Sequence, residues 1–247
     1  MNYTAFRTAY RHPSLALGKL LGRDEARTNC EHIEFELKKA RLRYSKLTED
    51  KLTLDDIIAQ FYRKICFFDN HVYPLCRWFK PDVVVETGVE AGASSAFCLQ
   101  ALEDNAKGHL HSIDLPNATY TFKDPDNPGE NIRVSNVIRG GGKTGYVVPA
   151  RLRNRWTLLI GDAKTELPSL LERIGSVDLF HHDSEHTYDF MRFEYDAVWD
   201  KLKSGGVLSS DDVNWNLAFR DFCAERQSKP HVVSAMGYTV KGEDVNS

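Results

Sequence analysis

Short apolar runs alternate with longer amphipathic stretches along the last two-thirds of the chain. The runs are rich in β-branched residues, as buried strands are, and lie at residues 82–86, 109–114, 156–160, 177–180 and 206–208. Helical periodicity follows at residues 96–105, 163–174, 187–202 and 215–226, although Pro168 could delay the start of the second helix. Residues 231–234 and 237–241 predict a closing antiparallel hairpin. The alternation predicts an α/β fold with a mostly parallel sheet and helices on both faces.

The first 80 residues have a different pattern, rich in Arg, Lys and Glu and without a convincing strand. Within residues 30–47, one helical face is predicted from Ile33, Leu37, Ala40 and Tyr44. Thr53 can cap a second helix that has Asp55 and Asp56 in its first turn. Its inward face would carry Ile57, Ile58, Phe61, Ile65 and Phe68. We expect residues 1–80 to form a helical cap on a domain spanning residues 81–247, with a dimerisation element or a substrate lid as the alternative.

Composition narrows the class of protein. The 247 residues are 42% hydrophobic and 27% charged, as in a globular protein with a sizeable core. The net charge of −3 argues against a general nucleic-acid binder. No apolar run reaches the length of a membrane span, and the N-terminus lacks the apolar core of a signal peptide. Five widely spaced cysteines without a C-x-x-C pair favour reduced thiols in a cytoplasmic protein.

The densest candidate chemistry lies within residues 177–212. Asp183 follows one predicted strand, and Asp211 and Asp212 follow the next; between them, Gly205-Gly206 is interpreted as the stop signal of the intervening helix. Parallel strands end at one edge of a sheet, where ligands of open α/β folds bind, so these carboxylates should converge with His186. Oxygen ligands of this kind suit magnesium or calcium.

The neighbouring histidines offer a competing interpretation, in which His182, Asp183 and His186 bind zinc. Consecutive side chains of a strand point to opposite faces, so His181 and His182 cannot readily join one site. The same carboxylates, with a water molecule activated by histidine, would also suit a metal-dependent hydrolase.

A glycine-containing turn links the first predicted strand to its helix. Residues 87–95 read TGVEAGASS, and such a turn lets a ligand approach the backbone and the helix N-terminus. The dinucleotide fingerprint is absent, because Glu90 occupies the position of its middle glycine. The next strand ends at Asp114, 22 residues after Gly92, where an acid would bind ribose hydroxyls.

Residues 116–145 form a long polar insertion rich in proline and glycine. Its length is unusual for a compact domain, so we expect a lid or a substrate-facing loop. Gly142-Lys143-Thr144 looks like the end of a P-loop, but Val137 stands where that motif needs its first glycine. The sequence therefore does not predict a nucleoside triphosphatase.

Together, these features resemble the class I S-adenosylmethionine (SAM) dependent methyltransferases, over about 160 residues from Asp82 to the C-terminus. Within this class, the run FHHDSEHTYDFMRFEYDAVWDKLKSGGVLSSDD resembles the metal-dependent small-molecule O-methyltransferases. That family includes enzymes that methylate sugars on macrolide antibiotics, and relatives from cephalosporin pathways. The resemblance implies a Rossmann-like fold: a mostly parallel seven-stranded sheet, a C-terminal antiparallel hairpin and an N-terminal helical cap.

The resemblance also implies roles for individual residues. The cofactor would be bound by Glu86, Gly88, Gly92, Ser94, Asp114, Asp162 and Ala163. Asp114 would contact the ribose hydroxyls, while Asp162 and Ala163 would flank adenine. The metal ligands would be Asp183, Asp211 and Asp212, with magnesium or another divalent cation, and His186 would be the catalytic base beside Asp183. Relatives often carry Glu at the position of Asp211, and the shorter side chain leaves the metal distance open.

The expected function is O-methyl transfer from SAM to a small molecule with a free hydroxyl, such as a sugar or natural product. A divalent cation would stabilise the acceptor alkoxide, and His186, with an ordinary pKa of about 6.5, would take the proton. The alternatives are a metal-dependent hydrolase and a non-catalytic SAM-binding protein. We expect neither nucleic acid nor a membrane as a partner, and self-association through the N-terminal helices stays open.

Overall fold

The computed structural model describes residues 25–50, 52–65, 68–123, 129–135, 138 and 143–244. Seven strands form the main sheet in the order β5-β2-β1-β6-β7-β9-β8. They are β1 Val83–Thr87, β2 His109–Asp114, β5 Trp156–Ile160, β6 Val177–His182, β7 Leu202–Ser210, β8 His231–Val233 and β9 Met236–Val240. The first five of these are parallel, whereas β9 pairs antiparallel with both β7 and β8. The predicted parallel sheet with a closing antiparallel hairpin is confirmed.

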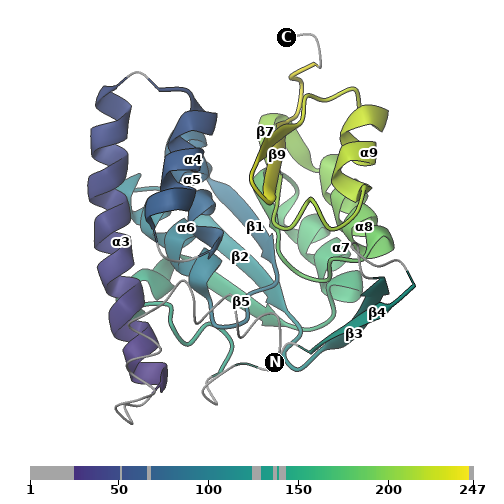
Figure 1. Cartoon of the computed structure of the whole chain (residues 1–247), viewed down its shortest axis with the longest axis horizontal. Helices are drawn as coiled ribbons and strands as arrows, with labels where there is room; N and C mark the ends of the chain where they lie inside the picture. Colours follow the sequence, from purple (N-terminus) through teal and green to yellow (C-terminus); the bar gives the residue numbers. More distant parts are fainter. Residues whose placement is uncertain are drawn as a thin grey trace.

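Helices cover both faces of the sheet (Figure 1). On one face lie α3 Glu25–Glu49, α4 Leu54–Lys64, α5 Val72–Phe79 and α6 Ala93–Asp104, with the short 3-10 helices η1 Phe68–His71 and η3 Ala150–Arg155. On the other face lie α7 Ala163–Ile174, α8 Tyr188–Trp199 and α9 Ala218–Glu225. Helix α7 has the predicted bounds, and Pro168 lies within it without delaying its start.

Consecutive strand residues supply the two hydrophobic cores. Val84 and Leu179 belong to the core under α3–α6, whereas their neighbours Val85 and Phe180 belong to the core under α7–α9. All four side chains are fully buried. This explains why the strands read as continuous apolar runs: each one faces a helical layer on both sides.

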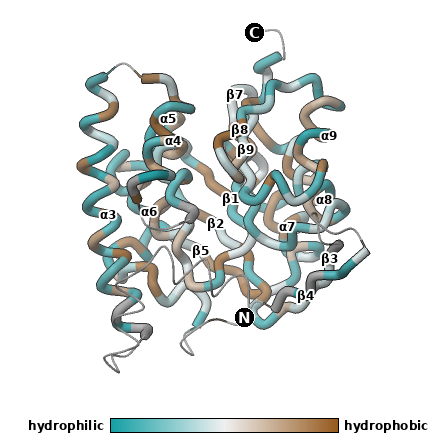
Figure 2. The backbone as a smooth tube through the Cα atoms, viewed as in Figure 1, coloured by the Kyte–Doolittle hydropathy of each residue, from teal (hydrophilic) through white to brown (hydrophobic). Residues whose placement is uncertain are grey.

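The N-terminal helices bury the faces that their periodicity predicts. Ile33, Leu37 and Ala40 of α3 are fully buried, and hydrophobic and hydrophilic residues alternate along this helix in Figure 2. Helix α4 begins with the predicted Thr53 cap, which forms a reciprocal capping box with Asp56. The prediction for the side chain of Phe68 lies outside the described residues. A domain division at residue 80 stays a prediction. Residues on both sides of this position contribute to one hydrophobic core between α3–α6 and the sheet.

Gly205-Gly206 does not stop the helix, so this prediction was wrong. Helix α8 ends at Trp199, and β7 begins at Leu202 and runs through both glycines. The pairing of β7 with β6 shifts register between Val177 and Leu179. Gly205 has a φ of +76° within this irregular part of the strand, so the glycines accommodate a bulge. Helix α9 also begins later than predicted, at Ala218.

The predicted insertion contains a structure that the sequence analysis missed. Strands β3 Thr119–Lys123 and β4 Asn131–Ser135 form a separate two-stranded antiparallel sheet, which lies apart from the main sheet in Figure 1. A role as a lid stays a prediction. Within the described part of the chain, no helix is long and apolar enough to cross a membrane.

Candidate active site

Two adjoining cavities lie at the carboxyl ends of the parallel strands. The first, of about 250 Å³, is bordered by the predicted cofactor residues Asp162 and Ala163. The second, of about 170 Å³, is bordered by residues predicted for metal binding and catalysis. Gly88, Asp114 and Ser184 line both cavities. The predicted adenosine and metal sites therefore lie side by side, as transfer between them would require.

Gly88 lies where the two cavities meet, and only glycine fits there. Its φ of +85° is one that side-chain-bearing residues rarely adopt, and an added Cβ would overlap the backbone carbonyl of Asp183. The amide of Asp183 also donates to the carbonyl of Thr87 at 2.8 Å. The turn after β1 and the loop after β6 are therefore in direct backbone contact.

Asp114, at the end of β2, holds a fixed carboxylate between the two cavities. Its Oδ1 accepts hydrogen bonds from the backbone amides of Val89 at 3.0 Å and Glu90 at 3.3 Å. Its Oδ2 accepts one from the hydroxyl of Thr144 at 2.9 Å. The side chain is only 7% exposed, but it borders both cavities, as a ligand of the cofactor ribose should.

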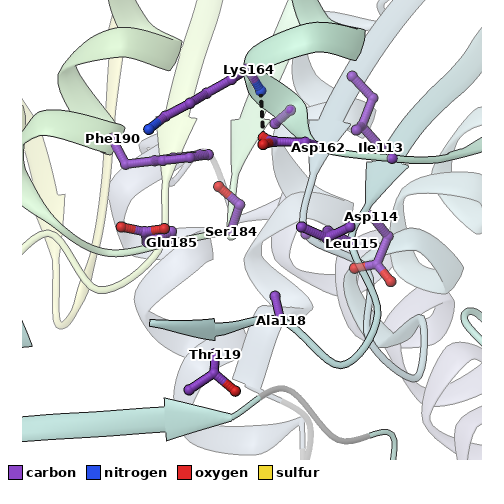
Figure 3. Close-up of a pocket in the computed structure, with 13 residues that line it drawn as sticks. Ile113, Asp114, Leu115, Ala118, Thr119, Asp162, Lys164, Ser184, Glu185 and Phe190 are labelled. Atoms are coloured by element: carbon purple, nitrogen blue, oxygen red, sulfur yellow. Dashed lines mark hydrogen bonds between the residues drawn. The ribbon is translucent and has the colours of Figure 1, made fainter. Parts of the chain in front are cut away.

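The first cavity has the predicted adenine residues at one end. Asp162 caps α7 by accepting a hydrogen bond from the amide of Lys164 at 2.9 Å. The ammonium of Lys164 lies 5.3 Å from the centre of the Phe190 ring. In Figure 3 Lys164 and Phe190 lie on one side of the cavity and Asp114 lies on the other, with Asp162 between them. The lining combines apolar residues with polar and charged ones, which suits a ligand that has both an apolar ring and polar groups.

Three predicted cofactor residues border neither cavity: Glu86, Gly92 and Ser94. The carboxylate of Glu86 is buried and accepts hydrogen bonds from the hydroxyls of Ser94, Ser95 and Ser112. Burial raises its pKa, while the three hydroxyls act in the opposite direction. These hydrogen bonds join β1 to the first turn of α6 and to β2. Direct contact of Glu86, Gly92 and Ser94 with a cofactor stays a prediction.

The second cavity brings together three of the four residues predicted for metal binding and catalysis. Asp183, His186 and Asp212 all line it, and His186 Nε2 lies 3.9 Å from Asp183 Oδ1. The ring of Trp215 lies 5.3 Å from that of His186 and closes one side. Asp211 is not part of this lining, and its amide donates to the carbonyl of His182 at 2.9 Å.

The carboxylates at the second cavity fit a magnesium site that water and substrate complete better than a site built from protein ligands alone. Among the described residues, no group of three or more His, Cys, Asp or Glu side chains is arranged to hold a metal ion. Magnesium, however, is commonly bound by one or two carboxylates, and water and substrate oxygens complete its coordination. Asp183 and Asp212 border one cavity and could supply such carboxylates. A site built from three aspartates stays a prediction.

His186 is held in its neutral form. Burial lowers its pKa from 6.5 to about 3, and the neighbouring His182 adds to this decrease. This pKa is well below the ordinary histidine pKa of about 6.5 that the predicted role as a base assumed. Its Nε2 is buried and has no hydrogen-bond partner among the described residues. A neutral imidazole with an open ring nitrogen can accept a hydrogen bond from a bound hydroxyl, and the role of His186 as the base stays a prediction.

Glu194 of α8 is a buried residue that the sequence analysis did not identify. Its Oε2 accepts a hydrogen bond from the hydroxyl of Thr87 at 2.6 Å. The same oxygen is hydrogen-bonded to His182 Nδ1, also at 2.6 Å. Its Oε1 accepts a hydrogen bond from Ser184 at 2.9 Å. One carboxylate thus links β1, β6 and the loop that carries Asp183 and His186. The available signal was a glutamate on the apolar face of a predicted helix, where burial requires partners.

The zinc interpretation gains no support, because among the described residues no group of three or more His, Cys, Asp or Glu side chains is arranged to hold a metal ion. His182 is paired with Glu194, and His181 lies 3.1 Å from the hydroxyl of Ser209 through its Nδ1.

Comparison with known proteins provides independent evidence. Residues 85–213 match the family described as "Methyltransferase domain", which is more than half of the chain. No curated protein sequence matches the chain significantly.

Two solved proteins share the fold. A structure of CalS11, a calicheamicin methyltransferase, is 18% identical with a TM-score of 0.55, and the match covers 83% of this chain and 93% of that one. An apo structure of CalS11, described as a TDP-rhamnose 3′-O-methyltransferase, is 16% identical with a TM-score of 0.50, covering 83% and 94%. The O-methyltransferase NovP is 15% identical with a TM-score of 0.51, covering 72% and 81%. At these identities the likeness shows the fold, and it confirms the class I methyltransferase architecture.

Proposed function

The chain belongs to the methyltransferase domain family, and on this premise we propose that it methylates a hydroxyl oxygen of a small molecule. One observation carries the proposal. A cavity lined by His186 and two carboxylates adjoins the predicted cofactor cavity at Gly88, Asp114 and Ser184. A methyl donor bound in one cavity would therefore be next to an acceptor bound in the other, and proximity of this kind accounts for much of the rate in group transfer.

SAM, when bound, supplies an electrophilic methyl group. We place its adenine beside Asp162 and Ala163 and its ribose on Asp114, because all three residues line the first cavity and Asp114 also borders the second. Gly88 would lie beneath the part of the cofactor that crosses into the second cavity. In this placement the turn after β1 orients the methyl group toward Asp183 and His186.

The second cavity would bind and deprotonate the acceptor. Asp183 and Asp212, with Asp211 as a third candidate, would hold a divalent cation, which supplies Lewis-acid stabilisation of a developing alkoxide. His186 would accept the hydroxyl proton at its Nε2, which forms no hydrogen bond among the described residues. Trp215 would shield this proton transfer from water on one side.

We propose a sugar or a related hydroxylated natural product as the acceptor. Two neighbouring oxygens of such a molecule could chelate the cation and select the position that is methylated. CalS11, which shares the fold, is described as acting on TDP-rhamnose. Nucleotide-linked sugars are therefore the first compounds to test.

The test is methyl transfer from radiolabelled SAM to a panel of nucleotide sugars and hydroxylated natural products, with and without EDTA. Asp183→Ala and Asp212→Ala should abolish transfer while leaving the affinity for S-adenosylhomocysteine nearly unchanged. Asp200→Ala, at the exposed end of α8, is the matched control and should retain activity. If the two cavity variants lost cofactor affinity and nothing else, the metal site would be misassigned.

Metal binding can be tested without an acceptor. Electron paramagnetic resonance should detect Mn²⁺ bound to the purified protein, and Asp183→Ala should release it. Equal Mn²⁺ binding by both proteins would contradict the proposed site.

A further inference from the structure

We propose that Thr144 is a positioning residue for the cofactor, because its hydroxyl holds the carboxylate of Asp114 in the orientation that binds ribose. The inference rests on the proposed function and extends it to a residue outside the turn after β1. We call this turn, residues 87–92, the cofactor turn. The inference also gives a role to the last residue of Gly142-Lys143-Thr144, a run that resembles the end of a P-loop but lacks its first glycine.

The contacts of Asp114 leave room for a ribose. Two backbone amides bind Oδ1, and the hydroxyl of Thr144 binds Oδ2 at 2.9 Å. A carboxylate offers about four acceptor positions, so these three donors fix its plane without exhausting its capacity. Asp114 borders both cavities, and the remaining capacity is available to a ligand there. Thr144 is the one protein donor to Oδ2 among the described residues, so without its hydroxyl the carboxylate could rotate.

The segment that carries Thr144 is attached to the cofactor turn along its length. The amide of Gly145 donates to the carbonyl of Glu90 at 2.9 Å. The amide of Val147 donates to the carbonyl of Ala91 at 3.0 Å. A Cβ added at Gly92 would lie 2.8 Å from the Cα of Gly145, so the two glycines permit this close approach. We call residues 143–148 the strap. Because its backbone is paired with the turn, the position of Thr144 is defined relative to Asp114.

The strap is also held from its other side. The guanidinium of Arg153 donates to the carbonyl of Gly145 at 2.8 Å and lies 5.4 Å from the centre of the Trp156 ring. That ring packs against Gly145, where a Cβ would overlap it. Asn29 of α3 donates to the hydroxyl of Tyr146 at 2.6 Å. A hydroxyl presented by a segment supported in this way is suited to orienting a second group.

The experiment is calorimetric titration of S-adenosylhomocysteine into the wild-type protein, Thr144→Val and Thr144→Ser. Valine has the shape of threonine but no hydroxyl, so Thr144→Val should weaken binding about tenfold, which corresponds to about 1.4 kcal/mol. Thr144→Ser keeps the hydroxyl and should restore most of the affinity. Thr165→Val, at an exposed position of α7, is the matched control and should bind as the wild type does.

A ribose analogue separates positioning from a general structural effect. With S-(2′,3′-dideoxyadenosyl)homocysteine, which has no ribose hydroxyls, wild type and Thr144→Val should bind equally. An equal loss for both ligands, or unchanged or tighter binding of S-adenosylhomocysteine by Thr144→Val, would overturn the inference. If Thr144→Val did not fold, the same comparison with Thr144→Ala would decide. No binding by the wild type would instead count against the proposed function, so the two failures are distinguishable.

Discussion

Gly88 determines how closely the cofactor turn approaches the loop that carries Asp183. The sequence identified this glycine as part of a ligand-binding turn, but it did not reveal what the missing side chain makes room for. In the structure that space belongs to the backbone carbonyl of Asp183. A contact between residues about a hundred positions apart depends on strand order, which the local pattern around Gly88 does not contain.

Gly88→Ala should displace the loop that carries Asp183 and impair both cofactor binding and methyl transfer. The positive φ alone costs about 1–2 kcal/mol for a residue with a side chain. Gly175→Ala is a matched control, because Gly175 also has a positive φ, +77°, but an added Cβ would have no neighbour within 4 Å. Urea unfolding should show a similar strain cost in both variants and an additional loss in Gly88→Ala. Equal stability and unchanged affinity for S-adenosylhomocysteine would contradict this account.

Asp114 and the second cavity show what residue-level reasoning could predict. Acids at the ends of parallel strands must meet at one edge of the sheet, and the structure places Asp114, Asp183 and Asp212 there. Asp211 is adjacent in sequence to Asp212, yet it does not line the cavity. The direction of the Asp211 side chain depends on the turn after β7, where Asp212 adopts a φ of +48°.

His181 should make the fold sensitive to acid. Burial lowers its pKa well below 6.5, with His71 adding to the decrease, so the folded state keeps it neutral while the unfolded state protonates below about pH 6.5. The unfolded state therefore binds more protons, and stability should fall with decreasing pH by up to about 1.4 kcal/mol per pH unit from this group. Urea unfolding of wild type and His181→Asn between pH 7.5 and 5 measures this contribution. Parallel pH curves for the two proteins would contradict it.

At the scale of elements, periodicity predicted which helices and strands are present more reliably than it predicted their first and last residues. Helix α7 matches its prediction, because Asp162 caps it and Gly175 ends it, which are both local signals. Strand β7 begins earlier than predicted, because tertiary pairing with β6 extends a strand through two glycines. The β3–β4 hairpin was missed because polar, proline-rich surroundings concealed two short segments that pair only with each other.

Helix α8 contributes a buried carboxylate that joins three parts of the site. Glu194→Gln replaces one carboxylate oxygen with an NH2 donor, so either Ser184 or the pair Thr87 and His182 should lose its acceptor, and a buried donor left without its partner costs about 1–3 kcal/mol. Urea unfolding should show a loss of this size, together with reduced methyl transfer. Glu172→Gln, at an exposed position of α7, is the control and should change stability by less than about 0.5 kcal/mol. Equal stability of the two variants would mean that the network contributes little.

At the scale of the whole molecule, the sequence predicted the layered architecture well. A chain of strand–helix alternations has few ways to bury apolar runs on both sides, and the parallel sheet between two helical layers is one of them. The sequence did not predict that residues 143–148 lie along the cofactor turn, since this depends on how a long insertion returns to the sheet. Self-association through the N-terminal helices stays a prediction; Phe35 and Leu42 of α3 are 62% and 61% exposed.

Calorimetric titration of S-adenosylhomocysteine into the purified protein, with and without magnesium, shows directly whether the first cavity binds a methyl-donor cofactor. We predict saturable binding of one equivalent in both conditions, because Asp183, Asp211 and Asp212 do not line the cofactor cavity. Asp114→Asn should weaken this binding, and Asp183→Ala should retain it. Absence of binding in either condition would contradict the assignment of the two cavities as a methyl-transfer site.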